Sequence, residues 1–191
     1  MSNPVPNTRE SDEALEALFE EIYRQEFDFV WRLVRRFGAR DRDREDLVHD
    51  VFVAVHRSLS TYDRGRPLRP WLFGVTFRVV SDYRRRARFD REIPVEAHAT
   101  AATPPVAHER LEQGERAALV AEGLERVPFE QRVVFVMHEM EGQTVPEIAR
   151  VLGIPENTCY SRLRLARKRF TSAVRAISAA RESYVSPAES E

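Results

Sequence analysis

The sequence predicts an all-α protein made of two small helical domains joined by a flexible linker. Apolar residues recur at three- and four-residue steps through most of the chain, which is the spacing of amphipathic helices. The nearest strand candidate, residues 133–137, lies inside such a helical period. Residues 91–108 contain prolines and alanines with no apolar period, which is typical of a linker. The predicted segments are a disordered N-terminus (1–13), a first domain (14–90), the linker (91–108), a second domain (109–175) and a C-terminal tail (176–191).

The first domain is predicted to contain three helices. The first covers 14–37 and ends before Gly38, which is a plausible stop. The second covers about 43–59, with one apolar stripe and an opposite polar face. A charged loop with two prolines follows, and a third helix runs from Trp71 to about residue 88. The polar face of the second helix carries Asp46, His49, Asp50, Val53 and Arg57.

The second domain is predicted to contain helices at about 109–126, 129–141, 145–152 and 156–175. Thr144 and Glu147 have the spacing of a capping box, and Pro146 stands in the first turn of the helix that they begin. Gly153 stands where a helix ends in a left-handed residue, and the next helix follows at once. This pattern predicts a helix-turn-helix, in preference to a simple αα-hairpin with a solvated basic face.

The second helix of this motif has a buried stripe that includes Cys159 and an opposite polar face. Short polar residues at its start suit base edges and phosphates, and arginines further along suit phosphates or guanine. The residues expected to contact DNA are Asn157, Thr158, Tyr160, Ser161, Arg162, Arg164, Arg167 and Lys168.

Composition excludes several classes of site. The single cysteine rules out an intramolecular disulfide and a CxxC site. His49 and His56 have no third ligand nearby, so we expect no metal, and no glycine-rich cofactor motif is present. Carboxylate clusters and nucleophile–base pairs are also missing, so an enzyme is not expected. The chain has no signal peptide or membrane span, which predicts a cytoplasmic protein without membrane insertion.

The net charge of −1 hides a strong local asymmetry. Residues 78–91 carry six arginines and two aspartates, and residues 162–175 carry six basic residues and no acid. Residues 1–26 hold seven acids against two arginines, and residues 92–125 hold the same numbers of each. Two separate basic blocks predict two contacts with a polyanion.

Aromatic residues interleave with arginines around the first of these blocks. This combination suits unpaired nucleic acid, because bases stack on rings while arginines hold phosphates. The loop at 60–70 could also form a pocket for an extruded base. We expect Trp71 and Phe73 to be mostly core residues. The residues expected to contact DNA here are Tyr62, Arg64, Arg66, Trp71, Arg78, Tyr83, Arg84, Arg85, Arg86 and Arg88.

Both halves of the chain resemble bacterial sigma factors. The segments that resemble sigma domain two are DLVHDVF (46–52), RPLRPWLF (66–73) and SDYRRR (81–86). Those that resemble domain four are VPFEQRVVF (127–135), EGQT (141–144), EIA (147–149), LGIP (152–155) and SRLRLAR (161–167). With no room for a domain three, the chain is similar to the extracytoplasmic-function (ECF) group of the sigma-70 family.

This resemblance implies a transcription-initiation factor that binds core RNA polymerase, directs it to promoters and assists melting. The polar face of helix 43–59 would dock on the β′ clamp helices, and the β flap would be a second contact. Loop 60–70 and the third helix would recognise and melt the −10 element, and helix 156–169 would read the −35 element. An anti-sigma factor is a further partner that the resemblance implies.

The residues themselves leave three other classes of protein to consider. A helix-turn-helix repressor or response regulator would bind its operator as a dimer without polymerase. A nucleic-acid processing enzyme would need clustered catalytic groups. An RNA-binding adaptor would bind single strands regardless of the second domain. The arginine block behind an aromatic loop favours the sigma factor over the repressor.

Overall fold

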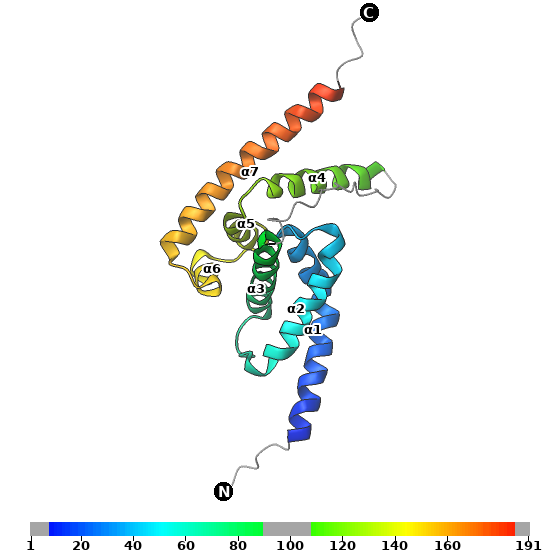
Figure 1. Ribbon diagram of the computed structural model, residues 1–191, viewed down its shortest axis with the longest axis vertical. Coiled ribbons are helices and arrows are strands. Elements are labelled where there is room, and N and C mark those ends of the chain that lie inside the picture. Colours follow the sequence, from blue (N-terminus) through cyan, green and yellow to red (C-terminus); the bar gives the residue numbers. More distant parts are fainter. Residues whose placement is uncertain (1–7, 90–107, 186–191) are drawn as a thin grey trace, which may run out of the picture. The chain divides into compact units, whose positions relative to one another are not determined.

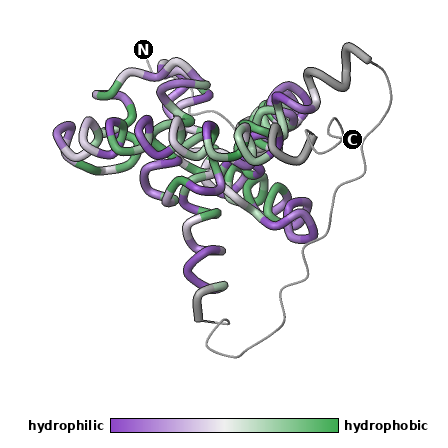
Figure 2. The backbone as a smooth tube through the Cα atoms, turned by 90° about the horizontal axis from the view of Figure 1, so that it is seen from above, coloured by the Kyte–Doolittle hydropathy of each residue, from purple (hydrophilic) through white to green (hydrophobic). Residues whose placement is uncertain are grey.

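The computed structural model describes residues 8–89 and 108–185, and all the elements found there are helical (Figure 1). The chain folds into two compact units, Met1–Arg86 and Ala87–Glu191. Hydrophilic and hydrophobic residues alternate around the helices, as amphipathic packing requires (Figure 2). The all-α prediction is therefore confirmed. Residues 1–7 of the predicted N-terminus, 91–107 of the predicted linker and 186–191 of the predicted tail lie outside the described residues, and residue 108 begins a helix.

The first unit is built from three helices. They are α1 (Thr8–Arg36), α2 (Arg44–Ser58) and α3 (Leu68–Phe89), with short 3₁₀ turns η1 (Asp41–Asp43) and η2 (Leu59–Thr61) flanking α2. The buried residues of their core include Ile22, Phe29, Val30, Leu33 and Val34 from α1, Phe37 just after it, Leu47, Val48, Val51, Phe52 and Val55 from α2, and Leu72, Phe73, Val75 and Val80 from α3. These residues are the apolar stripes of the sequence, so burial of one face per helix holds the unit together.

An ion pair between a buried glutamate and an exposed arginine joins α1 to the start of α3. Glu26 is only 9% exposed, and its Oε2 lies 3.0 Å from Nε of Arg69. The Arg69 guanidinium also lies 5.1 Å from the ring centre of Phe29. The pair fixes where α3 begins, and therefore where the preceding loop ends.

The helix α1 begins at Thr8 rather than at residue 14. The sequence-based boundary rested on the apolar period, which starts only at Leu15. Residues 10–13 contain three acids, and negative charge near a helix N-terminus is favourable because of the helix dipole.

The second unit contains α4 (His108–Glu125), α5 (Phe129–Phe135), the π-helix η4 (Val136–Met140), α6 (Val145–Leu152) and α7 (Glu156–Val185). The long α7 contacts α4, α5 and α6. Gly123 permits close packing of α4 on α7, because a Cβ there would lie 3.0 Å from the side chains of both Phe170 and Val174. None of the helices in the described ranges is long and apolar enough to cross a membrane.

Two elements of this unit differ from the prediction. Predicted helix 129–141 changes at Val136 from α to π geometry, which the apolar period does not distinguish. Predicted helix 156–175 continues to Val185 as part of α7. The extension has a physical reason: Ile177 is buried, and Arg181 Nη2 lies 3.1 Å from Oε2 of Glu122 in α4.

Candidate nucleic-acid interface

The start of α6 is fixed by the predicted capping box. The backbone N–H of Thr144 donates to Glu147 Oε2 at 2.8 Å, and the Thr144 hydroxyl donates to the same oxygen at 2.7 Å. These bonds from Thr144 lower the pKa of the Glu147 carboxyl. The reciprocal bond from the Glu147 backbone to the threonine side chain is also present. The box therefore sets the angle at which the first helix of the motif begins.

The turn between α6 and α7 depends on Gly153. Its φ of 65° and ψ of 34° are left-handed, and the N–H of Ile154 donates to the Ala149 carbonyl at 3.0 Å. A side chain would strain this conformation. Cys159 is buried, and burial raises the pKa of its thiol, which fits a packing role. The helix-turn-helix of the sequence prediction is therefore present, with α7 as its second helix.

The residues predicted to read DNA form one accessible face at the start of α7. Tyr160 is 55% exposed, which is unusual for a large side chain of this type. Thr158 and Arg162 are half-buried at the edge of this face. The exposed members of the predicted set are Asn157, Tyr160, Ser161, Arg164, Arg167 and Lys168.

Some of these cations have acidic partners that the sequence did not indicate. Arg162 Nη1 lies 3.0 Å from Oε2 of Glu130 in α5. Arg167 Nη2 lies 2.6 Å from Oε1 of Glu139 in η4. The 162–175 segment itself contains no acid, so the partners come from elements distant in sequence. The positive face of α7 is thus partly neutralised within unit 2.

A buried arginine, Arg132, joins two helices of the same unit. Its role was not predicted from the sequence. Arg132 is 5% exposed, and its Nη2 donates to the carbonyls of Glu125 at 2.8 Å and Val127 at 3.0 Å. These carbonyls lie at and just after the end of α4, where helical partners run out. Arg132 therefore ties α5 to the end of α4. The available sequence signal was an arginine next to the apolar run VVF in the segment VPFEQRVVF.

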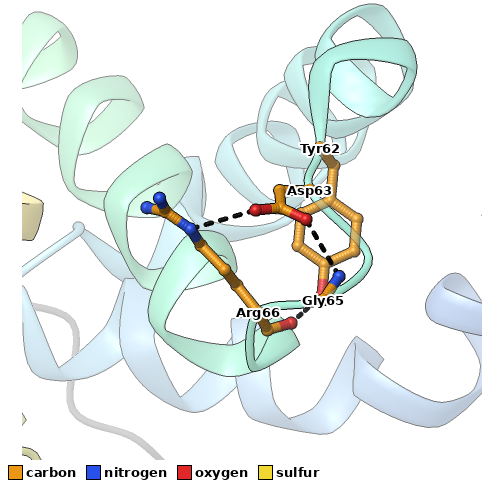
Figure 3. Close-up of polar contacts among 4 residues, drawn as sticks. All are labelled: Tyr62, Asp63, Gly65 and Arg66. Atoms are coloured by element: carbon orange, nitrogen blue, oxygen red, sulfur yellow. Dashed lines mark hydrogen bonds and ion pairs between the residues drawn. The ribbon is translucent and has the colours of Figure 1, made fainter.

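In unit 1, the loop before α3 is a closed turn (Figure 3). Asp63 Oδ1 accepts from the Gly65 N–H at 3.0 Å, and Asp63 Oδ2 accepts from Arg66 Nε at 3.1 Å. The hydroxyl of Tyr62 donates to the Arg66 carbonyl at 2.6 Å. Burial raises the pKa of this hydroxyl. Asp63 was not among the predicted residues, although an Asx-type turn in the sequence Asp-Arg-Gly is a recognisable signal.

Tyr62 also contacts Trp71 in the first turns of α3. Their ring centres are 4.7 Å apart and the planes are inclined by 35°. Phe73 is buried, as expected, whereas Trp71 is half-buried and belongs to the edge of the loop. The structure therefore brings together four of the predicted residues: Tyr62, Arg64, Arg66 and Trp71 lie on or beside one ordered loop.

The basic end of α3 presents a second group of predicted residues. Arg78, Arg85 and Arg86 are exposed, and Arg84 is half-buried. Arg85 Nη2 lies 3.0 Å from Asp82 Oδ1, so one cation of the block has a local acidic partner. Tyr83 is half-buried and its hydroxyl donates to Asp43 Oδ2 at 2.7 Å. Burial and this bond raise the pKa of the tyrosine. The side chain of Arg88 lies outside the described part.

The predicted polymerase-binding residues share the solvent side of α2. Asp46, His49, Asp50 and Arg57 are exposed and Val53 is half-buried, while the opposite side of the helix enters the core. In the described ranges no group of three or more side chains could hold a metal ion. The face of α2 therefore carries exposed acidic and basic side chains that suit contacts with another protein.

Comparison with known proteins gives both halves the same assignment. The family described as Sigma-70 region 2 matches residues 22–89, and the family described as Sigma-70, region 4 matches residues 117–170. The chain is 30% identical over 151 residues to the ECF RNA polymerase sigma factor SigM of Mycobacterium tuberculosis, covering 79% of this chain and 74% of SigM.

Two solved structures have a similar fold. One is CnrH in complex with the cytosolic domain of CnrY, with a TM-score of 0.58, 26% identity and coverage of 84% of this chain and 90% of CnrH. The other is the sigma factor RpoE in complex with the anti-sigma factor NepR from Bartonella quintana, with a TM-score of 0.63 and 17% identity over 82% of this chain and 96% of RpoE.

The relationship to SigM and the two region matches decide the assignment, and they agree with the helix-turn-helix and the aromatic–arginine loop. The chain belongs to the ECF group of sigma-70 family sigma factors, and it is a transcription-initiation factor that binds RNA polymerase and promoters.

Proposed function

We propose that unit 2 reads the −35 element of the promoter through the exposed face of α7. The observation that carries this proposal is the helix-turn-helix geometry. The capping box fixes the start of α6 and Gly153 forms the turn into α7, whose polar face is exposed to solvent. Ser161 and Arg164 stand at the centre of that face. A helix of this kind enters the major groove with its first turns against the bases, and its cations hold phosphates.

The test of this assignment combines a protein change with a promoter change. In transcription by core polymerase with the full chain, Arg164→Ala should lower output from a promoter with an intact −35 element by about tenfold, because a good base contact is worth about 1–3 kcal/mol. Altering the contacted −35 base pair should then cause no further loss of transcription by the Arg164→Ala variant. If the protein change and the promoter change each lower transcription independently, so that their effects multiply, Arg164 does not read that base pair. Arg175→Ala, an exposed cation further along α7, is the control.

Unit 1 is proposed to recognise and open the −10 element. The closed Tyr62–Arg66 turn lies before α3, and Arg78, Arg85 and Arg86 are exposed along that helix. Aromatic rings can stack on unpaired bases while the arginines hold the strand. Arg85→Ala with Arg86→Ala should reduce open complexes more than it reduces polymerase binding. Equal losses of both would overturn this assignment.

The exposed face of α2 is proposed to bind the β′ clamp helices of the polymerase, and unit 2 is proposed to contact the β flap. Mixed charges on Asp46, Asp50 and Arg57 around the partly buried Val53 give a polar rim with an apolar centre. A paired Asp46→Ala and Asp50→Ala change should weaken capture of core polymerase while leaving binding to DNA by the free chain unaltered.

An anti-sigma factor is a proposed partner. The two similar structures support it, because CnrH is bound to the cytosolic domain of CnrY and RpoE to the anti-sigma factor NepR. We also propose that the chain acts in the cytoplasm as a binding factor without catalytic activity of its own. This agrees with its family, in which the polymerase performs the chemistry.

A further inference from the structure

A third basic region lies outside the two blocks assigned above. Residues 32–44 contain six arginines and two aspartates, at the end of α1 and the start of α2. Arg35 and Arg36 stand three and four residues after Arg32, so both lie beside Arg32 on one face of α1. Like charges placed this closely repel each other and so destabilise the folded chain, which indicates that the cluster serves a purpose other than stability.

The acids of this region are already engaged. Asp41 pairs with Arg44, whose guanidinium also lies 5.8 Å from the ring centre of Trp31. Asp43 Oδ1 lies 3.4 Å from Arg42 Nε, and Asp43 Oδ2 accepts the hydroxyl of Tyr83.

Three arginines of this region remain open to a ligand. Arg32, Arg35 and Arg40 are exposed, and in the described ranges none of them has a carboxylate within ion-pair distance. Partial burial and the neighbouring Arg44, Arg36 and Arg32 lower the pKa of Arg35, and Asp41 opposes this shift. A bound anion would act in the same direction as Asp41.

The region is continuous with the basic end of α3. The Tyr83–Asp43 hydrogen bond of 2.7 Å joins the two, and Arg85 and Arg86 lie two and three residues after Tyr83 on α3. A hydrogen bond with the backbone of Arg40, and then the charge of Arg40, oppose the rise of the Tyr83 pKa, so Arg40 lies next to that hydroxyl. A strand held by α3 would therefore pass beside Arg40.

We propose that Arg32, Arg35 and Arg40 form an additional phosphate-binding surface that extends the DNA-contacting end of α3. Its ligand is the sugar–phosphate backbone of promoter DNA next to the −10 element, bound without regard to base sequence. Exposed arginines suit this ligand because the guanidinium forms bidentate bonds with phosphate. The inference rests on the proposed role of α3 in binding that element.

The test is the salt dependence of promoter binding by polymerase assembled with the full chain. The DNA is a fragment that the wild-type assembly transcribes, and the variant carries Arg35→Gln with Arg40→Gln. Each lost phosphate contact reduces the slope of log affinity against log salt by about 0.7 for single strands and about 0.9 for duplex. We expect a total reduction of about 1.4–1.8. Arg35→Lys with Arg40→Lys should retain the wild-type slope, because lysine keeps the charge.

The control, Arg24→Gln with Arg116→Gln, removes the same charge from exposed positions outside the basic blocks. An unchanged slope in the Arg35 and Arg40 variant, an equal reduction in the control, or loss of polymerase assembly would each overturn the proposal. Arg85→Gln with Arg86→Gln is measured in parallel. If only the Arg85 and Arg86 variant reduces the slope, the proposed surface of Arg32, Arg35 and Arg40 is wrong and the role of α3 stands. If neither variant reduces the slope, the proposed role of α3 is wrong as well.

Discussion

Arg167 of α7 and Glu139 of η4 form an ion pair in which Nη2 and Oε1 are 2.6 Å apart, and Arg167 Nε donates to the same oxygen at 2.7 Å. Both side chains remain partly exposed. The pair places a carboxylate against one of the cations predicted to hold promoter phosphates. If Arg167 holds a promoter phosphate as proposed, DNA competes with this acid for the arginine in the free chain.

Replacing Glu139 by glutamine should raise the affinity of the free full chain for a duplex that carries the −35 element. An exposed ion pair is worth about 0.2–1 kcal/mol, so the gain should be at most about fivefold. Fluorescence anisotropy at fixed salt measures it, with Glu115→Gln, an exposed acid on α4, as the control. Reduced affinity would mean instead that Glu139 orients Arg167 for DNA.

The Thr144–Glu147 capping box makes the stability of unit 2 depend on pH. The pKa of Glu147 is lowered in the folded chain, chiefly by the Thr144 hydroxyl. Its carboxylate therefore stabilises the fold above its unfolded pKa of about 4.3, and this contribution is lost as pH falls through the lower folded value. Glu147→Gln should cost about 1 kcal/mol or less at pH 7, and the difference from wild type should shrink toward pH 3. Urea unfolding followed by circular dichroism measures both. A difference that stays constant with pH would contradict the charge-based account.

Loss of Arg132 should destabilise unit 2 far more than loss of a surface arginine. Arg132→Ala leaves the carbonyls of Glu125 and Val127 without their partner, which costs on the order of 1–3 kcal/mol. The exposed Arg150 on α6 is the matched control, and Arg150→Ala should change stability by less than about 0.5 kcal/mol. Thermal unfolding of the full chain compares the two. Equal effects would show that the buried bonds carry little stability.

Asp63 should favour promoter opening, although its negative charge repels the DNA. Asp63→Ala removes the bonds to the Gly65 N–H and Arg66 Nε, so the loop must be ordered when DNA binds. Ordering one residue costs about 1–2 kcal/mol, which predicts at least about fivefold fewer open complexes. Permanganate reactivity of unpaired thymines measures this, and capture of core polymerase should stay unaltered. Asp28→Ala, on the exposed side of α1, is the control. An increase in open complexes would mean that Asp63 merely repels DNA.

Local sequence signals predicted the fold well. The apolar periods located the helices, and the Thr144–Glu147 box and Gly153 were recognisable because both depend on side chains within one turn of each other. The start of α1 was missed because its first residues carry acids rather than apolar residues. The π-helix was missed because its apolar spacing differs little from that of an α-helix over five residues.

The site was predicted less completely, because its contacts join residues far apart in sequence. Glu130 and Glu139 neutralise arginines of α7 from other elements, and the Tyr83–Asp43 bond spans from α3 to η1. No spacing rule identifies such partners. The position of the predicted residues on solvent-facing sides of α2, α3 and α7 follows directly from the apolar period, since residues off the buried stripe must face outward.

The most direct test of the account is start-site mapping in vitro with core polymerase, the full chain and fragments of the source genome. The account predicts discrete start sites that core polymerase alone does not use, preceded by two shared sequence elements. It further predicts that Arg164→Ala removes dependence on the upstream element only, and that Arg85→Ala with Arg86→Ala impairs opening at the downstream one. Start sites identical to those of core polymerase alone, or dependence on both elements unchanged in both variants, would contradict it.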